Sequence, residues 1–160
     1  MARGTIYYIT DRPEELVIRF DSMSLAGEID AIGASYADNK STDESVSALS
    51  GIRDDMLHKG ARIICDVNHD GFSFALTLDN AFKFKQDYFG PRLAKLKEKA
   101  AVLQLFDVIQ SAPMLDNMLN DEYGDYVCFN GSSFLTYDNF IRRIEQGKTY
   151  YVLDHVLYLH

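Results

Sequence analysis

The stretch Arg62-Ile-Ile-Cys-Asp-Val-Asn-His-Asp-Gly-Phe-Ser-Phe-Ala-Leu-Thr-Leu78 decides the expected fold of this 160-residue chain. In its second half, large apolar side chains alternate with small or polar ones, which is the period-2 pattern of a half-buried strand. In its first half, Ile63, Cys65 and Val67 share one face of a second strand. The Asp-Gly pair at 70–71 lies between the two apolar runs and is a strong turn signal. The sequence therefore predicts a β-hairpin over about residues 62–78.

The pattern leaves two registers open for this hairpin. If residues 68–71 form a four-residue loop, Ile63 faces Leu76. If Asp70 and Gly71 alone form a type I′ turn, the register moves by two residues. A shift of two keeps every side chain on the same face, so the buried face is predicted more firmly than the register.

Length and composition predict one globular domain over residues 1–160. The chain is 47% hydrophobic and 25% charged, which is typical of a folded protein with a core of its own. It has no apolar run long enough to span a bilayer and no signal-peptide pattern, so we expect no membrane partner.

Cys65 and Cys128 both lie in apolar, strand-like runs. This favours buried free thiols in a reducing compartment, and we expect a cytoplasmic protein.

The net charge of −8 limits the choice of partner. Nucleic-acid binding draws its affinity from neutralising phosphates, so we expect no broad direct nucleic-acid surface. A basic protein partner fits the charge, although solubility alone also explains it. The basic exception is the segment 83–99, where Arg92, Lys95 and Lys99 share one helical face. The polar side of an amphipathic helix is sufficient to account for this face.

Strands and helices are mixed along the chain without a regular βαβ alternation. We predict strands over 5–10, 126–129 and 150–159, and helices over about 24–37, 42–59, 80–89, 91–110, 114–119 and 137–146. For Leu16–Phe20, helix and strand both fit. The pattern predicts an α+β fold with a mainly antiparallel sheet, built around the central hairpin and covered by several packed helices.

The longest predicted helix, 91–110, follows a break at Gly90-Pro91. Leu93 belongs to an apolar stripe on its first half. Its second half is apolar on most sides, which favours burial at the centre of the domain. A homodimer face is the alternative use of this second half.

The run Asp66-x-Asn68-x-Asp70-Gly71 matches the first six positions of an EF-hand-type loop, whose oxygen ligands bind calcium. The match then fails, because the twelfth position is Thr77 and supplies no bidentate carboxylate. A polar turn whose side chains cap their own backbone is the favoured interpretation. A calcium-responsive module using Asp66, Asn68 and Asp70 is the first alternative function.

A small hydrolase using a cysteine and a histidine is the second alternative. It would pair Cys128 with His155, or Cys65 with His69. Both cysteines are expected to be buried, whereas a nucleophilic thiolate needs access and a lowered pKa. The same four residues match no compact zinc spacing.

An acidic patch rich in tyrosine gives the favoured hypothesis for function. Its residues are Asp116, Asp121, Glu122, Tyr123 and Asp125. Carboxylates beside tyrosines can present a DNA-like face to a basic cleft. We therefore expect a small, acidic, non-enzymatic protein-binding protein with a basic partner, and assign it no catalytic residue and no cofactor. A more specific form of the hypothesis is an inhibitor of a basic nucleic-acid-handling enzyme, of the anti-defence type found in mobile elements.

Overall fold

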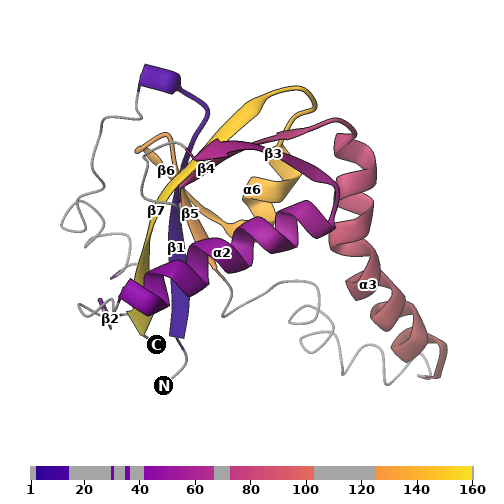
Figure 1. Ribbon diagram of the computed structural model, residues 1–160. Helices are drawn as coiled ribbons and strands as arrows, with labels where there is room; N and C mark the ends of the chain where they lie inside the picture. The colour runs from indigo at the N-terminus through magenta and orange to yellow at the C-terminus, as the bar shows by residue number, and fades with distance from the viewer. Residues whose placement is uncertain are drawn as a thin grey trace.

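The computed structural model describes residues 3–14, 30, 35–36, 42–66, 73–102 and 125–159 (Figure 1). One sheet runs in the order β3-β4-β7-β1-β5-β6, and the short β2 also pairs with β7. The strands are β1 (Arg3–Thr10), β2 (Ser35–Tyr36), β3 (Ala61–Asp66), β4 (Phe74–Leu78), β5 (Tyr126–Phe129), β6 (Ser133–Thr136) and β7 (Thr149–Leu159). The helices are α2 (Thr42–His58), α3 (Ala81–Val102) and α6 (Tyr137–Arg143). All pairings are antiparallel except that of β1 with β5, so the predicted α+β class is confirmed.

The centre of the sheet is the pair β7 and β1 rather than the hairpin. Strand β7 has 11 residues and is rich in β-branched and aromatic side chains, which suit a pleated surface. It pairs with β1, β4 and β2. The predicted hairpin does form, as β3 and β4, but it lies at one end of the sheet.

From Ala61 to Ile63, the pairing of β3 with β4 has the register expected for the four-residue loop. Beyond Ile63 the register shifts. Ile63 pairs with Leu76, but an irregularity between Ile63 and Cys65 places Cys65 opposite Ala75. The turn itself lies outside the described residues. The prediction of a half-buried strand is wrong for β4, because all five of its residues are buried. An interior strand between β3 and β7, covered on both faces, has no solvated side on which polar residues are needed.

Two buried clusters occupy the two faces of the sheet. The larger one receives Leu49, Ile52 and Met56 from α2, Phe84 from α3, and further apolar side chains from α6. The smaller one consists of Ile6, Tyr8, Cys128, Leu153, Val156 and Tyr158. Leu57 follows the buried Met56 but is 55% exposed, because it lies about 100° around the helix from Met56.

Helix α3 differs most from its prediction. Asn80 caps it, since the Asn80 side chain accepts a hydrogen bond of 2.9 Å from the Lys83 amide. Phe82 is 72% exposed, whereas Phe84 is buried in the core.

The helix also continues through Pro91 to Val102 instead of breaking at Gly90-Pro91. A proline removes one backbone hydrogen bond, and a 22-residue helix retains the others. The expected burial of Leu93 is wrong as well, because α3 extends beyond the sheet in this half (Figure 1) and Leu93 is 48% exposed.

Helix α6 confirms the helix predicted over 137–146, and two predicted boundaries are corrected. Thr136 caps α6 by accepting a hydrogen bond from the Asn139 amide. Helix α6 ends at Arg143, and Gly147 instead forms the turn into β7, with φ of 74°. The helix predicted over 24–37 does not reach its expected end, because Ser35–Tyr36 form β2. Residues 16–20 and 103–124 lie outside the described part of the chain. No helix within the described ranges is long and apolar enough to cross a membrane.

Candidate functional site

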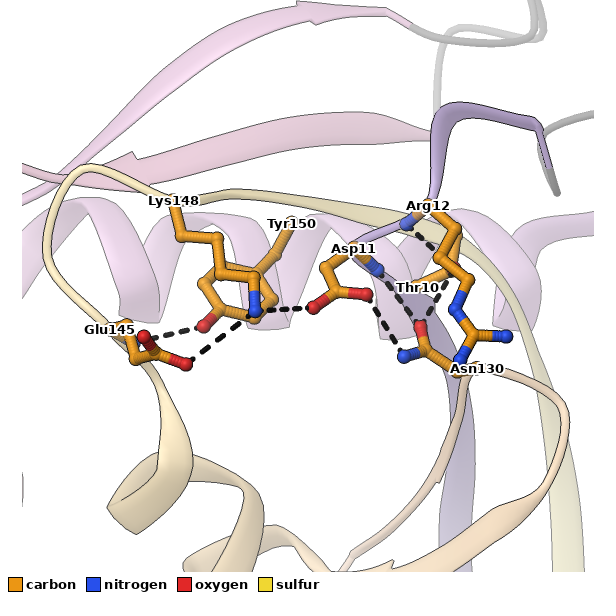
Figure 2. Close-up of polar contacts among 7 residues, drawn as sticks. All are labelled: Thr10, Asp11, Arg12, Asn130, Glu145, Lys148 and Tyr150. Carbon is orange, nitrogen blue, oxygen red and sulfur yellow. Dashed lines mark hydrogen bonds and ion pairs between the residues drawn. The ribbon is translucent and has the colours of Figure 1, made fainter.

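A polar network lies where β1 ends, beside the turn that joins β5 to β6 (Figure 2). The Asn130 side-chain oxygen accepts hydrogen bonds from the Thr10 hydroxyl at 2.9 Å and from the Asp11 amide at 3.0 Å. The Asn130 side-chain nitrogen donates to the Asp11 carboxylate at 2.9 Å. One side chain therefore joins the end of β1 to a turn 119 residues further along the chain.

The local sequence explains why Asn130 can do this. Asn130 and Gly131 both have positive φ, of 53° and 65°, and the Ser132 amide donates to the Phe129 carbonyl. This is a type I′ turn, and the Asn-Gly pair suits it because these two residue types tolerate the left-handed region best. The turn holds the Asn130 side chain against β1.

Lys148 extends the network toward solvent. Its ammonium lies 2.7 Å from the Asp11 carboxylate and 3.5 Å from that of Glu145. Burial alone would raise the pKa of Asp11, but the hydrogen bonds from Lys148 and Asn130 outweigh it and lower that pKa. The hydrogen bond to Asp11 raises the pKa of Lys148. Both groups therefore stay charged near neutral pH, and neither is tuned to exchange a proton there.

A pocket of about 380 Å³ opens beside Lys148. Its lining residues come from β5, β6, α6 and the start of β7, and they are Phe129, Leu135, Phe140, Arg143, Glu145, Lys148 and Tyr150. The rings of Phe129, Phe140 and Tyr150 pack together. Their centroids are 5.7 Å apart for Phe129 and Phe140, 6.3 Å for Phe129 and Tyr150, and 5.8 Å for Phe140 and Tyr150. The Tyr150 hydroxyl accepts a hydrogen bond of 2.9 Å from the Glu145 amide, which fixes the ring to the turn after α6. Burial raises the pKa of Tyr150, so this hydroxyl stays neutral.

The two arginines at the end of α6 are placed differently. Arg143 lines the pocket, and among the described residues no ion pair or hydrogen bond engages its exposed guanidinium. Arg142 lies outside the lining, with its guanidinium 5.6 Å from the centre of the Phe89 ring. Arg143 is therefore the uncommitted cation at the pocket.

A second polar cluster joins α3 to α6. The Tyr88 hydroxyl donates to Asp138 at 2.6 Å, and Arg92 donates to the other oxygen of the same carboxylate at 2.5 Å. Burial, followed by the hydrogen bond to Asp138, raises the pKa of Tyr88. Burial likewise raises the pKa of Tyr7 and of Tyr137, whose rings lie 6.1 Å apart. These three hydroxyls remain protonated, and those of Tyr7 and Tyr88 donate hydrogen bonds to Asp125 and Asp138 within the fold.

Asp125 is the one member of the predicted acidic patch in the described part of the chain. It accepts hydrogen bonds from the Thr5 amide at 3.0 Å and from the Tyr7 hydroxyl at 3.5 Å. Its carboxylate therefore contributes to holding β1. Asp116, Asp121, Glu122 and Tyr123 lie outside the described residues, and their joint role stays a prediction.

The residues of the alternative functions are only partly placed. Asp66 ends β3, whereas Asn68 and Asp70 lie outside the described residues, so the calcium hypothesis stays untested. No group of three or more potential metal ligands occurs within the described ranges.

Cys128 and His155 are not brought together as a catalytic pair. In the sheet, Cys128 lies opposite Tyr8, and His155 lies opposite Tyr7. Because adjacent residues of β1 point to opposite faces, the side chains of Cys128 and His155 lie on opposite faces of the sheet. This corrects the predicted pairing of the two residues. Both side chains are buried, as expected for Cys128 as a packing thiol.

Sequence patterns missed the network around Lys148. Asp11 and Asn130 are 119 residues apart, and no local pattern joins them. The positive φ expected of Asn130 is the one available signal. It indicates how the Asn130 side chain is oriented, but not which residue that side chain contacts. Comparisons with protein-family models, with curated proteins and with solved structures found no match.

Proposed function

We propose that this chain is a non-enzymatic protein-binding protein whose partner is basic. The observation that supports it most is where the negative charge lies along the sequence. Residues 100–125 contain five acidic residues and no lysine or arginine. The acidic residues are Asp107, Asp116, Asp121, Glu122 and Asp125. This segment therefore contributes −5 to the net charge of −8.

Charges in the described part largely compensate one another. Asp138 pairs with Arg92, Asp11 with Lys148, and Lys59 with Asp55. These pairs are used within the fold, so they add little to the attraction of a charged partner. The acidic surplus around Tyr123 carries no such compensation in the sequence, and it supports long-range attraction of a basic protein.

A basic nucleic-acid-handling enzyme is the partner class we propose, since such an enzyme carries a cleft built for phosphates. The burial of Cys128 as a packing side chain in the core suits the reducing conditions of the cytoplasm, where we propose that the protein resides. We also propose that two copies associate through the apolar second half of the helix predicted over 91–110. Sedimentation velocity tests this last point, and a monomer at every concentration contradicts it.

Charge-matched variants test the proposal. The test variant is Asp116→Asn, Asp121→Asn and Glu122→Gln together. The control removes the same charge at three exposed sites, through Asp54→Asn, Asp79→Asn and Glu98→Gln. Each immobilised protein is exposed to a nuclease-rich lysate at low salt, and bound basic proteins are identified and then titrated in purified form. We expect wild type and control to bind alike and the test variant to bind at least about tenfold more weakly. Equal weakening in both variants, or no bound basic protein, contradicts the proposal.

A further inference from the structure

The pocket beside Lys148 offers a surface suited to a flat ring. Phe129 and Leu135 are only partly buried in its lining, and the buried rings of Phe140 and Tyr150 pack beside Phe129. Aromatic rings favour offset or edge-to-face contact with a further ring, which adds about 0.5–1.5 kcal/mol per pair to the burial of area. The volume of about 380 Å³ lies at the small end of the range for small-molecule sites.

The charges at the rim favour a negative group on this ring. Lys148 is already committed to Asp11 at 2.7 Å and to Glu145 at 3.5 Å. Because the Lys148 ammonium offsets part of the negative charge of Glu145, that carboxylate attracts a cationic ligand less strongly. Arg143 is the other basic residue of the lining, and it is available to a ligand. Its guanidinium can donate two parallel hydrogen bonds to a carboxylate.

We propose that this pocket binds a small planar aromatic carboxylate, with its ring against Phe129 and Leu135 and its carboxylate on Arg143. This site is independent of the proposed binding of a basic protein, because it uses none of the acidic residues outside the described ranges. The two proposals can therefore fail separately.

Fluorescence titration with 2-naphthoate tests the site. The chain contains no tryptophan, so naphthoate emission is observed without indole background. We expect saturable binding to the wild type. The neutral analogue 2-naphthamide should bind about tenfold more weakly, which corresponds to about 1.4 kcal/mol.

Two matched variants locate the carboxylate. Arg143→Gln should weaken 2-naphthoate binding about tenfold and leave 2-naphthamide binding unchanged. Arg142→Gln removes the same charge one residue away, outside the lining, and should change the dissociation constant less than about twofold. Leu135→Tyr is a further variant that fills the pocket without introducing an indole, and it should abolish the binding of both compounds. Circular dichroism confirms that each variant is folded.

Three results would overturn the proposal. The first is the absence of saturable naphthoate binding to the folded wild type. The second is equal weakening by Arg143→Gln and Arg142→Gln, which would mean general charge attraction. The third is unchanged binding to Leu135→Tyr, which would place the ligand elsewhere on the protein.

Discussion

Two carboxylate–cation pairs of similar chemistry lie in different surroundings in this fold. Asp138 binds Arg92 between α3 and α6, where Tyr88 donates to the same carboxylate. Asp11 binds Lys148 at the rim of a pocket, where Lys148 also reaches Glu145. The first pair joins two helices, whereas the second borders a space that a ligand can enter. The residues around an ion pair, more than the pair itself, therefore decide whether the pair stabilises the fold or borders a pocket.

The largest effect is expected at the first pair. Asp138→Ala leaves the Tyr88 hydroxyl without its acceptor and Arg92 without its counter-ion. We expect it to lower the free energy of unfolding by about 2–3 kcal/mol, below the cost of breaking a fully buried pair because Arg92 still reaches water. Urea denaturation measures this. Asp87→Ala breaks an exposed pair with Lys83 on the same helix and should cost under about 0.5 kcal/mol. Equal losses in the two variants would show that Asp138 has no special role.

Asn130 tests the second region. Asn130→Gly keeps the positive φ of the turn and removes the three side-chain hydrogen bonds to Thr10 and Asp11. We expect a loss of about 2 kcal/mol, because each bond contributes about 0.5–1.5 kcal/mol and the remaining groups reach water in part. Asn130→Ala should cost about 1 kcal/mol more, since alanine is strained at positive φ. An Asn130→Gly variant as stable as wild type would contradict the role given to this network.

Sequence and structure agree where the signals are local. The Asn-Gly turn at 130–131, the cap at Thr136 and strands β1, β5 and β7 follow from short patterns of residue types. The central position of β7 does not, because strand order depends on contacts between distant residues. The choice of Phe84 over Phe82 for the core depends on the angle at which α3 meets the sheet.

The candidate site was less predictable than the fold. Asp11 and Asn130 are 119 residues apart, and no local pattern pairs them. The lining of the pocket combines β5, β6, α6 and β7, whose neighbourhood exists only in the folded sheet. Arg143 also resembles Arg142 in the sequence, and only the structure separates the two.

The smallest effect concerns pH. Because the pKa of Asp11 is lowered in the folded state, its contribution to stability is present above its ordinary pKa of 3.8 and is lost as the pH falls through the lower folded value. Wild type should therefore exceed Asp11→Asn in unfolding free energy near pH 6, by at most about 1 kcal/mol, and this difference should shrink below pH 4. Urea denaturation at a series of pH values measures it. A difference that grows as the pH falls would reverse the sign assigned to Asp11.

The most direct test of the contrast between the two regions measures binding and stability on the same two variants. The dissociation constant of 2-naphthoate and the free energy of unfolding are determined for Arg143→Gln and for Asp138→Ala. We predict that Arg143→Gln weakens binding about tenfold at unchanged stability, whereas Asp138→Ala loses stability and, while folded, binds 2-naphthoate as wild type does. Binding that weakens with stability in Asp138→Ala, or stability that falls in Arg143→Gln, would contradict the separation of the two roles.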